Sequence, residues 1–147
     1  MPEITVTVVS DIPASPAEVF AVIADFEQGP RWQPNMRSAR WTSPPPAGVG
    51  ATFEQTARFL GRDMTSGYEV TEYDPPRVVG IRSTTGPFPI SVRRVVESHG
   101  DGARITEVSS GRPTGIARLL SPFMKPILRR TIARDYRHLA QLLDRHR

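Results

Sequence analysis

The chain of 147 residues contains no cysteine and only three histidines. The missing cysteines exclude a disulfide framework, a thiol nucleophile and a cysteine-ligated metal site. The histidines, which are His99, His138 and His146, leave no clustered His/Asp/Glu spacing of the kind that binds a metal. We therefore expect a protein that works without a metal or another cofactor.

Long apolar runs are also missing. No stretch approaches the ~20 apolar residues that are needed to cross a bilayer, and no basic and then apolar leader opens the chain. We therefore expect a cytoplasmic protein without a transmembrane segment. The length fits a single domain over residues 1–147.

Two catalytic motifs are missing as well. No Gly-x-Ser-x-Gly nucleophile elbow occurs. The Gly48-Val-Gly50 segment lacks the lysine and the helix that a nucleotide-binding loop requires. An enzyme with this sequence would have to work by proton transfer and by holding a flexible substrate in a folded pose.

Positive charge is concentrated at the end of the chain. The net charge is +4, but residues 112–147 alone carry nine Lys and Arg against two Asp, a local balance of +7. A solvated helix face accounts for this pattern, and no aromatic residues alternate with the arginines as a base-stacking surface needs. We therefore expect no nucleic-acid partner, while a peripheral contact with a membrane surface through this basic segment stays open.

Two amphipathic helices frame the chain. The Ser-Pro-Ala-Glu segment beginning at Ser15 is a capping box with proline in the first turn, and it predicts a helix over Ser15–Phe26. A second Ser-Pro pair, at Ser121, predicts a long terminal helix over Ser121–Arg147. The apolar stripe of that helix drifts sideways after Pro126, which predicts a kink there.

Alternating apolar and polar residues fill the chain between the helices. The β-branched segment Ile4–Val9 predicts a first strand, and a second strand at Arg37–Trp41 follows a short helix or turn that contains Trp32. From residue 51 onward, three turn signals predict antiparallel hairpins: Gly61-Arg62, Pro75-Pro76 and His99–Gly102. A curved sheet closed by a terminal helix either fills the space between them or leaves a cavity for an apolar ligand.

The three turns fix the predicted register of the strands. The first turn places Phe59 opposite Met64 and Gln55 opposite Tyr68, and the last places Arg94 opposite Glu107. One face of the sheet would then carry an apolar set together with that charged pair. The opposite face would carry the pairs Glu69–Arg82 and Glu97–Arg104, as expected for solvent-exposed neighbours.

Several short motifs, spread over nearly the whole chain, carry a family resemblance. They are Ser15–Phe20, Trp32 with its flanking prolines, Gly48–Gly50, Tyr73–Arg77, Gly100–Thr106 and Arg134–Leu139. Together they resemble the START-like SRPBCC superfamily, in particular its polyketide cyclase/dehydrase and lipid-transport branch. The resemblance implies an α+β helix-grip fold: a seven-stranded antiparallel sheet wrapped around the long C-terminal helix, with two short helices after the first strand. It also implies a cavity for a hydrophobic ligand, but no single reaction, because members of the superfamily differ in function.

The polar groups on the inward face are the candidate site. Arg94 and Glu107 either form a salt bridge that satisfies only itself, or hold a carbonyl, phenol or carboxylate of a ligand. Gln55 and Tyr68 either orient a ligand oxygen or bond to each other or to a trapped water. Asp135, at the edge of the helix stripe, is expected to pair with an arginine. The predicted ligand-binding residues are Trp32, Phe53, Gln55, Phe59, Met64, Tyr68, Ile81, Val92, Arg94, Ile105, Glu107, Met124 and Leu128.

Three functions follow from these expectations. The first is binding of a small lipid, isoprenoid or polyketide-like molecule in a cavity of ~300–1,000 Å³ between the sheet and the terminal helix. The second is a cofactor-free cyclase or dehydratase that uses Glu107 and Tyr68 as catalytic groups for proton transfer. The third is a partner-binding module that acts through the basic C-terminal helix. The sequence allows either a monomer or a homodimer.

Overall fold

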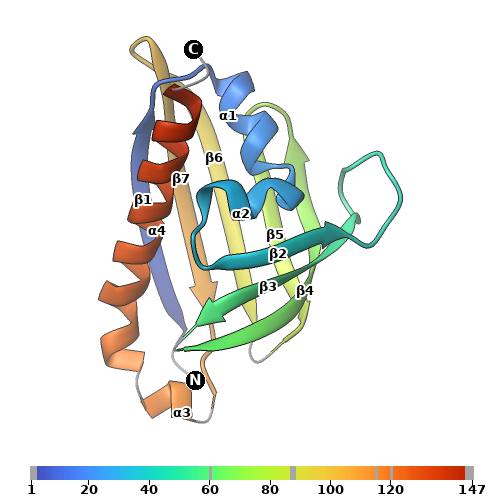
Figure 1. Ribbon diagram of the computed structural model, residues 1–147, viewed down its shortest axis with the longest axis vertical. Coiled ribbons are helices and arrows are strands. Elements are labelled where there is room, and N and C mark those ends of the chain that lie inside the picture. The colour runs from blue at the N-terminus through green and yellow to red at the C-terminus, as the bar shows by residue number, and fades with distance from the viewer. Residues whose placement is uncertain (1–2, 60, 87–88, 115, 120, 145–147) are drawn as a thin grey trace.

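A curved antiparallel sheet forms the body of the computed structural model, which describes residues 3–59, 61–86, 89–114, 116–119 and 121–144. Its strands and helices, shown in Figure 1, are β1 (Ile4–Ile12), α1 (Pro16–Ile23), the 3-10 helix η1 (Phe26–Gln28), α2 (Gly29–Trp32), β2 (Met36–Trp41), β3 (Thr52–Phe59), β4 (Arg62–Asp74), β5 (Val78–Thr85), β6 (Ile90–His99), β7 (Gly102–Gly111), α3 (Ile116–Leu119) and α4 (Ser121–Asp144). The seven strands pair in the order β1-β7-β6-β5-β4-β3-β2. Every pair is antiparallel.

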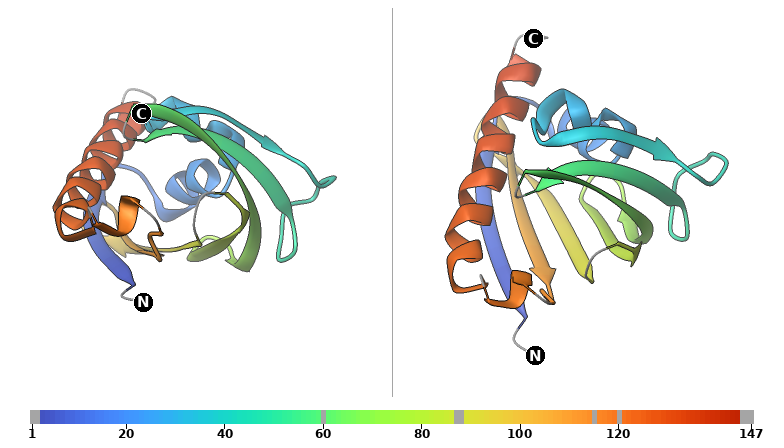
Figure 2. Two further views of the ribbon diagram at one scale, coloured as in Figure 1. Left: turned by 90° about the horizontal axis from the view of Figure 1, so that it is seen from below. Right: turned by 60° about the horizontal axis from the view of Figure 1, so that its bottom comes forward.

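The helices lie on the side toward which the sheet curves. Figure 2 shows the strands bending around α1, α2 and α4, while α3 lies at the lower end of the molecule. The long helix α4 packs along the edge strand β1 and also touches α2. It runs without a break through Pro126, and the predicted residues 145–147 of this helix lie outside the described ranges. None of the helices in the described part of the chain is long and apolar enough to span a membrane.

Helix α1 begins as predicted but ends earlier. Ser15 Oγ accepts the backbone N–H of Glu18, and the Glu18 carboxylate accepts the backbone N–H of Ser15, both at 3.2 Å, which confirms the capping box. The predicted end at Phe26 is wrong, because the backbone at Asp25 is extended and Phe26 opens η1 instead. The Asp25 carboxylate accepts hydrogen bonds from Gln28 and Trp41, and these contacts hold it outside a helix.

The β3–β4 hairpin corrects the predicted register by two residues. The structure places Ala57, not Phe59, opposite Met64, and it places Gln55 opposite Ser66 instead of Tyr68. The reason lies in the turn, because Arg62, which was predicted to be in the loop, already pairs with Phe59, and Gly61, with φ +79°, directly precedes this pair on β4. Because side chains alternate with a period of two, this shift leaves every inward residue on the predicted face.

The other two hairpins have the predicted register. Val70 lies opposite Ile81, and Arg94 lies opposite Glu107. On the outer face, Arg82 donates to Glu69 at 2.8 Å, as expected. Arg104 lies opposite Glu97 but donates to Asp11 of β1 instead, which ties the first strand to the last.

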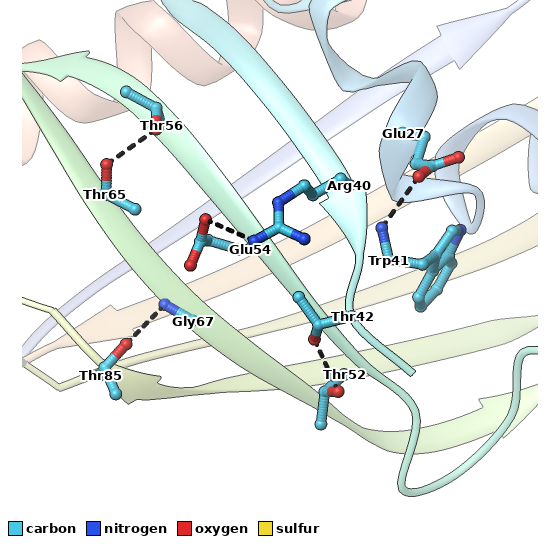
Figure 3. A network of polar contacts seen from close by, with 10 residues as sticks. All are labelled: Glu27, Arg40, Trp41, Thr42, Thr52, Glu54, Thr56, Thr65, Gly67 and Thr85. Carbon is cyan, nitrogen blue, oxygen red and sulfur yellow. Dashed lines mark hydrogen bonds and ion pairs between the residues drawn. The ribbon is translucent and has the colours of Figure 1, made fainter. Parts of the chain in front are cut away.

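Polar contacts fasten the strands β2, β3 and β4 to one another and to η1 (Figure 3). The backbone N–H of Trp41 donates to the Glu27 carboxylate at 2.9 Å, so that η1 holds the end of β2. Thr56 and Thr65 share a hydrogen bond of 2.8 Å across β3 and β4. These contacts fix the wall of the sheet that faces α4 from across the molecule.

Candidate functional site

A pocket of about 280 Å³ lies between the inner side of α4 and the concave face of the sheet. This volume is just below the ~300–1,000 Å³ that is usual for ligand sites. Exposed Asn35 and Arg58 belong to its lining, so the pocket reaches the surface near the start of β2 and the end of β3. Apolar side chains from β1, β5, β6 and α4 line one part of its wall, and polar side chains of β3, β6, β7 and α4 line another.

Nine of the predicted site residues line this pocket. They are Gln55, Met64, Tyr68, Ile81, Val92, Arg94, Glu107, Met124 and Leu128. Trp32, Phe53 and Ile105 lie in the core, where Phe53 stacks between Phe26 and Tyr68. The side chain of Phe59 lies outside the part of the structure that is described.

A second group of lining residues is not among the predicted ligand-binding residues. Val6, Ile90 and Ser109 continue the inward alternation of β1, β6 and β7 beyond the residues that were predicted. Phe26 and Met36 also line the pocket. Phe26 opens η1 and Met36 is the first residue of β2, so alternation along a strand did not predict where their side chains lie. Thr131 and Asp135 line the pocket because the side of α4 on which they lie faces the sheet. In the sequence, the only sign of this orientation is that these polar residues lie at the edge of the apolar stripe of the helix.

An ion pair joins the neighbouring strands β6 and β7 in the wall of the pocket. Arg94 Nε donates to Glu107 Oε1 at 2.9 Å, and both side chains are buried, at 8% and 6% exposure. Arg94 Nη1 donates to the backbone carbonyl of Ile23 at 3.2 Å. Its guanidinium also lies 5.2 Å from the ring centroid of Trp32, a distance at which the ring face attracts a cation. Helices α1 and α2 therefore complete the surroundings of this arginine.

The Glu107 carboxylate accepts hydrogen bonds from two further groups. Tyr136 of α4 donates its hydroxyl to Oε1, and Ser109 Oγ donates to Oε2 at 2.7 Å. Three donors on one carboxylate form a charge-assisted network that links β6, β7 and α4. Tyr136 is not among the predicted site residues, so its role in this network is a finding of the structure.

Burial shifts the pKa values of several groups in and near this network. Burial lowers the pKa of Arg94, but the Tyr136 oxygen and the Glu107 carboxylate outweigh it, so the net pKa is raised and the guanidinium stays charged. Burial raises the pKa of the Tyr136 hydroxyl well above its usual value. Burial also raises the pKa of Tyr68, although its neighbours Ser66 and Gln55 oppose the change. Both tyrosines are therefore neutral hydrogen-bond donors at physiological pH.

Asp135 is the other carboxyl of the pocket, and its setting is different. The residue is 7% exposed, and its Oδ1 has no hydrogen-bond partner among the described residues. Arg134 Nη2 lies 3.9 Å from this oxygen, too far for a hydrogen bond. Loss of solvation raises the pKa of Asp135 to about 7, and Arg134 only partly opposes it. Asp135 can therefore carry a proton or lack one near neutral pH.

The buried charged groups of the pocket lie at one end, and mainly apolar side chains lie toward the other, with Ser110 among them. Asp135 lies beside Tyr136 of the network, whereas Met124 lies eleven residues earlier on α4, ~16 Å away along the helix axis. Ile90 and Val92 of β6 precede Arg94 in the same direction. The arrangement can hold an elongated apolar molecule and present donors to an oxygen at one of its ends.

Comparison with known proteins agrees with this architecture. A family model described as polyketide cyclase / dehydrase and lipid transport matches residues 3–146. The chain belongs to this family. This match confirms the predicted resemblance to the polyketide cyclase/dehydrase and lipid-transport branch of the START-like SRPBCC superfamily. Solved structures with the same arrangement of sheet and helices confirm the predicted fold.

Three proteins that are similar to this chain are distant from it in sequence. The uncharacterized protein Rv2574 of Mycobacterium tuberculosis is 27% identical over 142 residues, which cover 91% of this chain and 81% of that protein. A protein of Thermus thermophilus, TTHA0849, is 19% identical, with a TM-score of 0.81 and 95% of each chain covered. The ZhuI aromatase/cyclase of Streptomyces is 15% identical, with the same TM-score of 0.81, covering 98% of this chain and 95% of that chain. Family and fold together indicate a ligand-binding domain of the START-like type.

Proposed function

We propose that this protein binds one small, mainly apolar molecule with an oxygen-bearing end in the pocket between the sheet and α4. The division of the pocket carries this proposal. Val92, Met124 and Leu128 offer an apolar wall, and Arg94 and Asp135 offer donors at the other end. Transfer of an apolar chain from water into such a wall is favourable, and the few polar groups fix its orientation.

The size of the pocket favours a compact ligand. A volume of about 280 Å³ suits an isoprenoid or a polyketide-like molecule better than a lipid with two long acyl chains. The oxygen of such a ligand would accept a hydrogen bond from the protonated Asp135 carboxyl, whose Oδ1 has no hydrogen-bond partner among the described residues. Binding would thereby satisfy a buried polar group that is otherwise costly.

The direct test is native mass spectrometry of the freshly purified protein, followed by organic extraction of any bound molecule. Anilinonaphthalene sulfonate, an apolar fluorophore with an anionic group, serves as a defined probe of the pocket. We expect Val92→Phe to abolish probe fluorescence, because Val92 lines the pocket. Val108→Phe is the matched control, since Val108 lies on the neighbouring strand and is 36% exposed.

Two results would overturn the proposal. One is equal probe binding by the wild type and the correctly folded Val92→Phe variant. The other is a wild-type protein that carries no co-purifying molecule and binds no probe. Circular dichroism of both variants establishes that they are folded.

A cofactor-free cyclase or dehydratase is the second candidate, and the ambiguous protonation of Asp135 favours it. A group whose pKa is close to 7 is suited to both giving and taking a proton. Glu107, the carboxylate expected in that role, is held by three donors, and Tyr68 would act as a donor only. In this reading Asp135→Asn abolishes turnover of a bound polyketide-like substrate and leaves its affinity within about threefold. Equal turnover by Asp135→Asn and the wild type would rule out Asp135 as the proton carrier.

A further inference from the structure

Three large apolar side chains are exposed at the lower end of the molecule. Leu119 of α3 is 77% exposed, and Phe123 and Ile127 of α4 are 66% and 51% exposed. Phe123 and Ile127 are four residues apart on a helix and therefore project from the same side. We call these three residues the apolar tip.

Cations lie next to the apolar tip. The segment Arg112–Arg134 contains six Lys and Arg but neither Asp nor Glu. Arg118 and Arg130 are exposed, and neither forms an ion pair within the described ranges. Arg118 directly precedes Leu119, and Arg130 follows Ile127 by three residues, so that it lies on the same side of α4. The outer face of the sheet is different, because Arg82, Arg93 and Arg104 all bind carboxylates there. Within the described ranges, Arg112 is paired with Glu3 and Arg134 lies near Asp135, so the positive charge of this segment is only partly compensated.

We propose that the apolar tip and its cations dock this protein on the surface of an anionic lipid bilayer. Basic side chains are attracted by anionic headgroups, and a small apolar cluster between them can enter the boundary of the acyl chains. Nucleic acid fits less well, because it would leave Leu119 and Ile127 without an apolar environment. A second copy of the chain fits less well too, because two such surfaces would bring like charges together.

The tip and the pocket share the same turns of α4. Phe123 and Ile127 point outward, and the residues that directly follow each of them, Met124 and Leu128, line the pocket. Docking would thus bring the apolar end of the pocket close to the acyl chains. Docking could then allow a ligand to pass between the bilayer and the pocket. This second step rests on the proposed function, whereas docking itself does not.

Flotation with lipid vesicles tests the docking. Vesicles of phosphatidylcholine alone are compared with vesicles that contain equal parts of phosphatidylcholine and phosphatidylglycerol. We expect binding to the anionic vesicles only, and a loss of most of that binding in about 0.5 M salt, where charges are screened within a few ångströms. Phe123→Ser/Ile127→Ser and Arg129→Glu/Arg130→Glu should each weaken the binding about tenfold or more.

Matched controls separate the tip from general changes in polarity and charge. Val9→Ser/Val49→Ser removes two apolar side chains that are 56% and 70% exposed elsewhere on the surface. Arg31→Glu/Arg62→Glu reverses two exposed arginines outside the tip. Both controls should bind anionic vesicles within about twofold of the wild type. Phe123→Ser/Ile127→Ser should keep its response to the pocket probe, so that a failure of docking and a failure of ligand binding are told apart.

Several outcomes would overturn the docking proposal. They are equal binding to neutral and anionic vesicles, binding to neither, and equal losses in the tip variants and the controls. Binding of the wild type to a short DNA duplex but not to vesicles would assign the cations to nucleic acid. A dimer in light scattering that Phe123→Ser/Ile127→Ser converts to a monomer, without any vesicle binding, would assign the tip to self-association.

Discussion

Arg93 and Arg94 are neighbours in β6, and each binds a glutamate at the same distance. Arg93 Nε lies 2.9 Å from Glu72, and Arg94 Nε lies 2.9 Å from Glu107. The side chains of the first pair are 54% and 43% exposed, whereas those of the second are 8% and 6% exposed. The two pairs share their residue types and the distance from Nε to the carboxylate, and the exposed pair even has a second hydrogen bond, from Arg93 Nη2 to Glu72 at 3.2 Å. The comparison therefore shows what burial changes for an ion pair.

The exposed pair is screened by water, and its contribution is small. The buried pair has lost the solvation of both charges, so each charge depends on the other and on further donors. Tyr136, Ser109 and the carbonyl of Ile23 supply those contacts. Asp135 faces the same pocket without such donors, and burial shifts its pKa instead.

The largest effect should come from breaking the buried pair. Arg94→Met leaves Glu107 buried without its counter-ion and should lower the free energy of unfolding by about 3–5 kcal/mol. Arg93→Met is the control on the opposite face and should cost at most about 1 kcal/mol. Urea denaturation of both variants measures the difference. Equal losses would show that burial does not distinguish the two pairs.

Removal of one donor from Glu107 should have a smaller effect. Tyr136→Phe deletes the hydroxyl that binds the carboxylate and should lower the free energy of unfolding by about 1–3 kcal/mol. Tyr73→Phe is a suitable control, because Tyr73 packs on the ring of Phe20 and its hydroxyl forms no hydrogen bond within the described ranges. If Tyr136→Phe lowers the free energy of unfolding no more than Tyr73→Phe does, the Tyr136 hydroxyl does not stabilise the network.

The raised pKa of Asp135 predicts how the stability of the protein depends on pH. Its folded-state pKa of about 7 exceeds its ordinary value of 3.8, so the folded protein keeps a proton that the unfolded chain releases. The contribution of this group to stability is fully present below about pH 4, and it falls as the pH rises toward 7. Asp135→Asn should therefore stabilise the protein by about 1–2 kcal/mol more at pH 8 than at pH 5.

Asp144→Asn provides the control for this pH dependence, since Asp144 is exposed on the same helix. Urea denaturation of the wild type and both variants at the two pH values gives the comparison. If Asp135→Asn increases the free energy of unfolding by the same amount at pH 5 and at pH 8, the raised pKa of Asp135 is contradicted.

The smallest effect is expected on the outer face of the sheet. Arg82→Met removes the exposed pair with Glu69 and should change the free energy of unfolding by less than about 1 kcal/mol. About 0.5 M salt should reduce that difference further, because exposed charges are screened. A larger cost, or one that salt does not change, would mean that exposure alone does not make a pair weak in this sheet.

The contrast between the two faces of the sheet was largely predictable from the sequence. The His99–Gly102 turn fixes the register of β6 and β7, and alternation then sends Arg94 inward and Arg93 outward. Even the wrong register at Gly61 kept the inward set intact, because it was shifted by two residues. Local turn chemistry and alternation are therefore sufficient to assign the faces of the strands.

The contacts of α4 with the sheet were not predictable in the same way. Periodicity placed Tyr136 and Asp135 near one side of a helix, but the rotation of that helix against β1 depends on tertiary packing. The hydroxyl of Tyr136 on Glu107 and the unpartnered oxygen of Asp135 follow from this rotation. The early end of α1 has a similar cause, since Asp25 is held by Trp41 from a distant strand.

The place of β1 at the edge of the sheet also bears on how the protein is made. Ile4 pairs with Gly111, so the first strand finds its partner only after about a hundred further residues have left the ribosome. Until then, Val6 and Val8 have no wall to pack against, and they are open to misassembly or to capture by a chaperone.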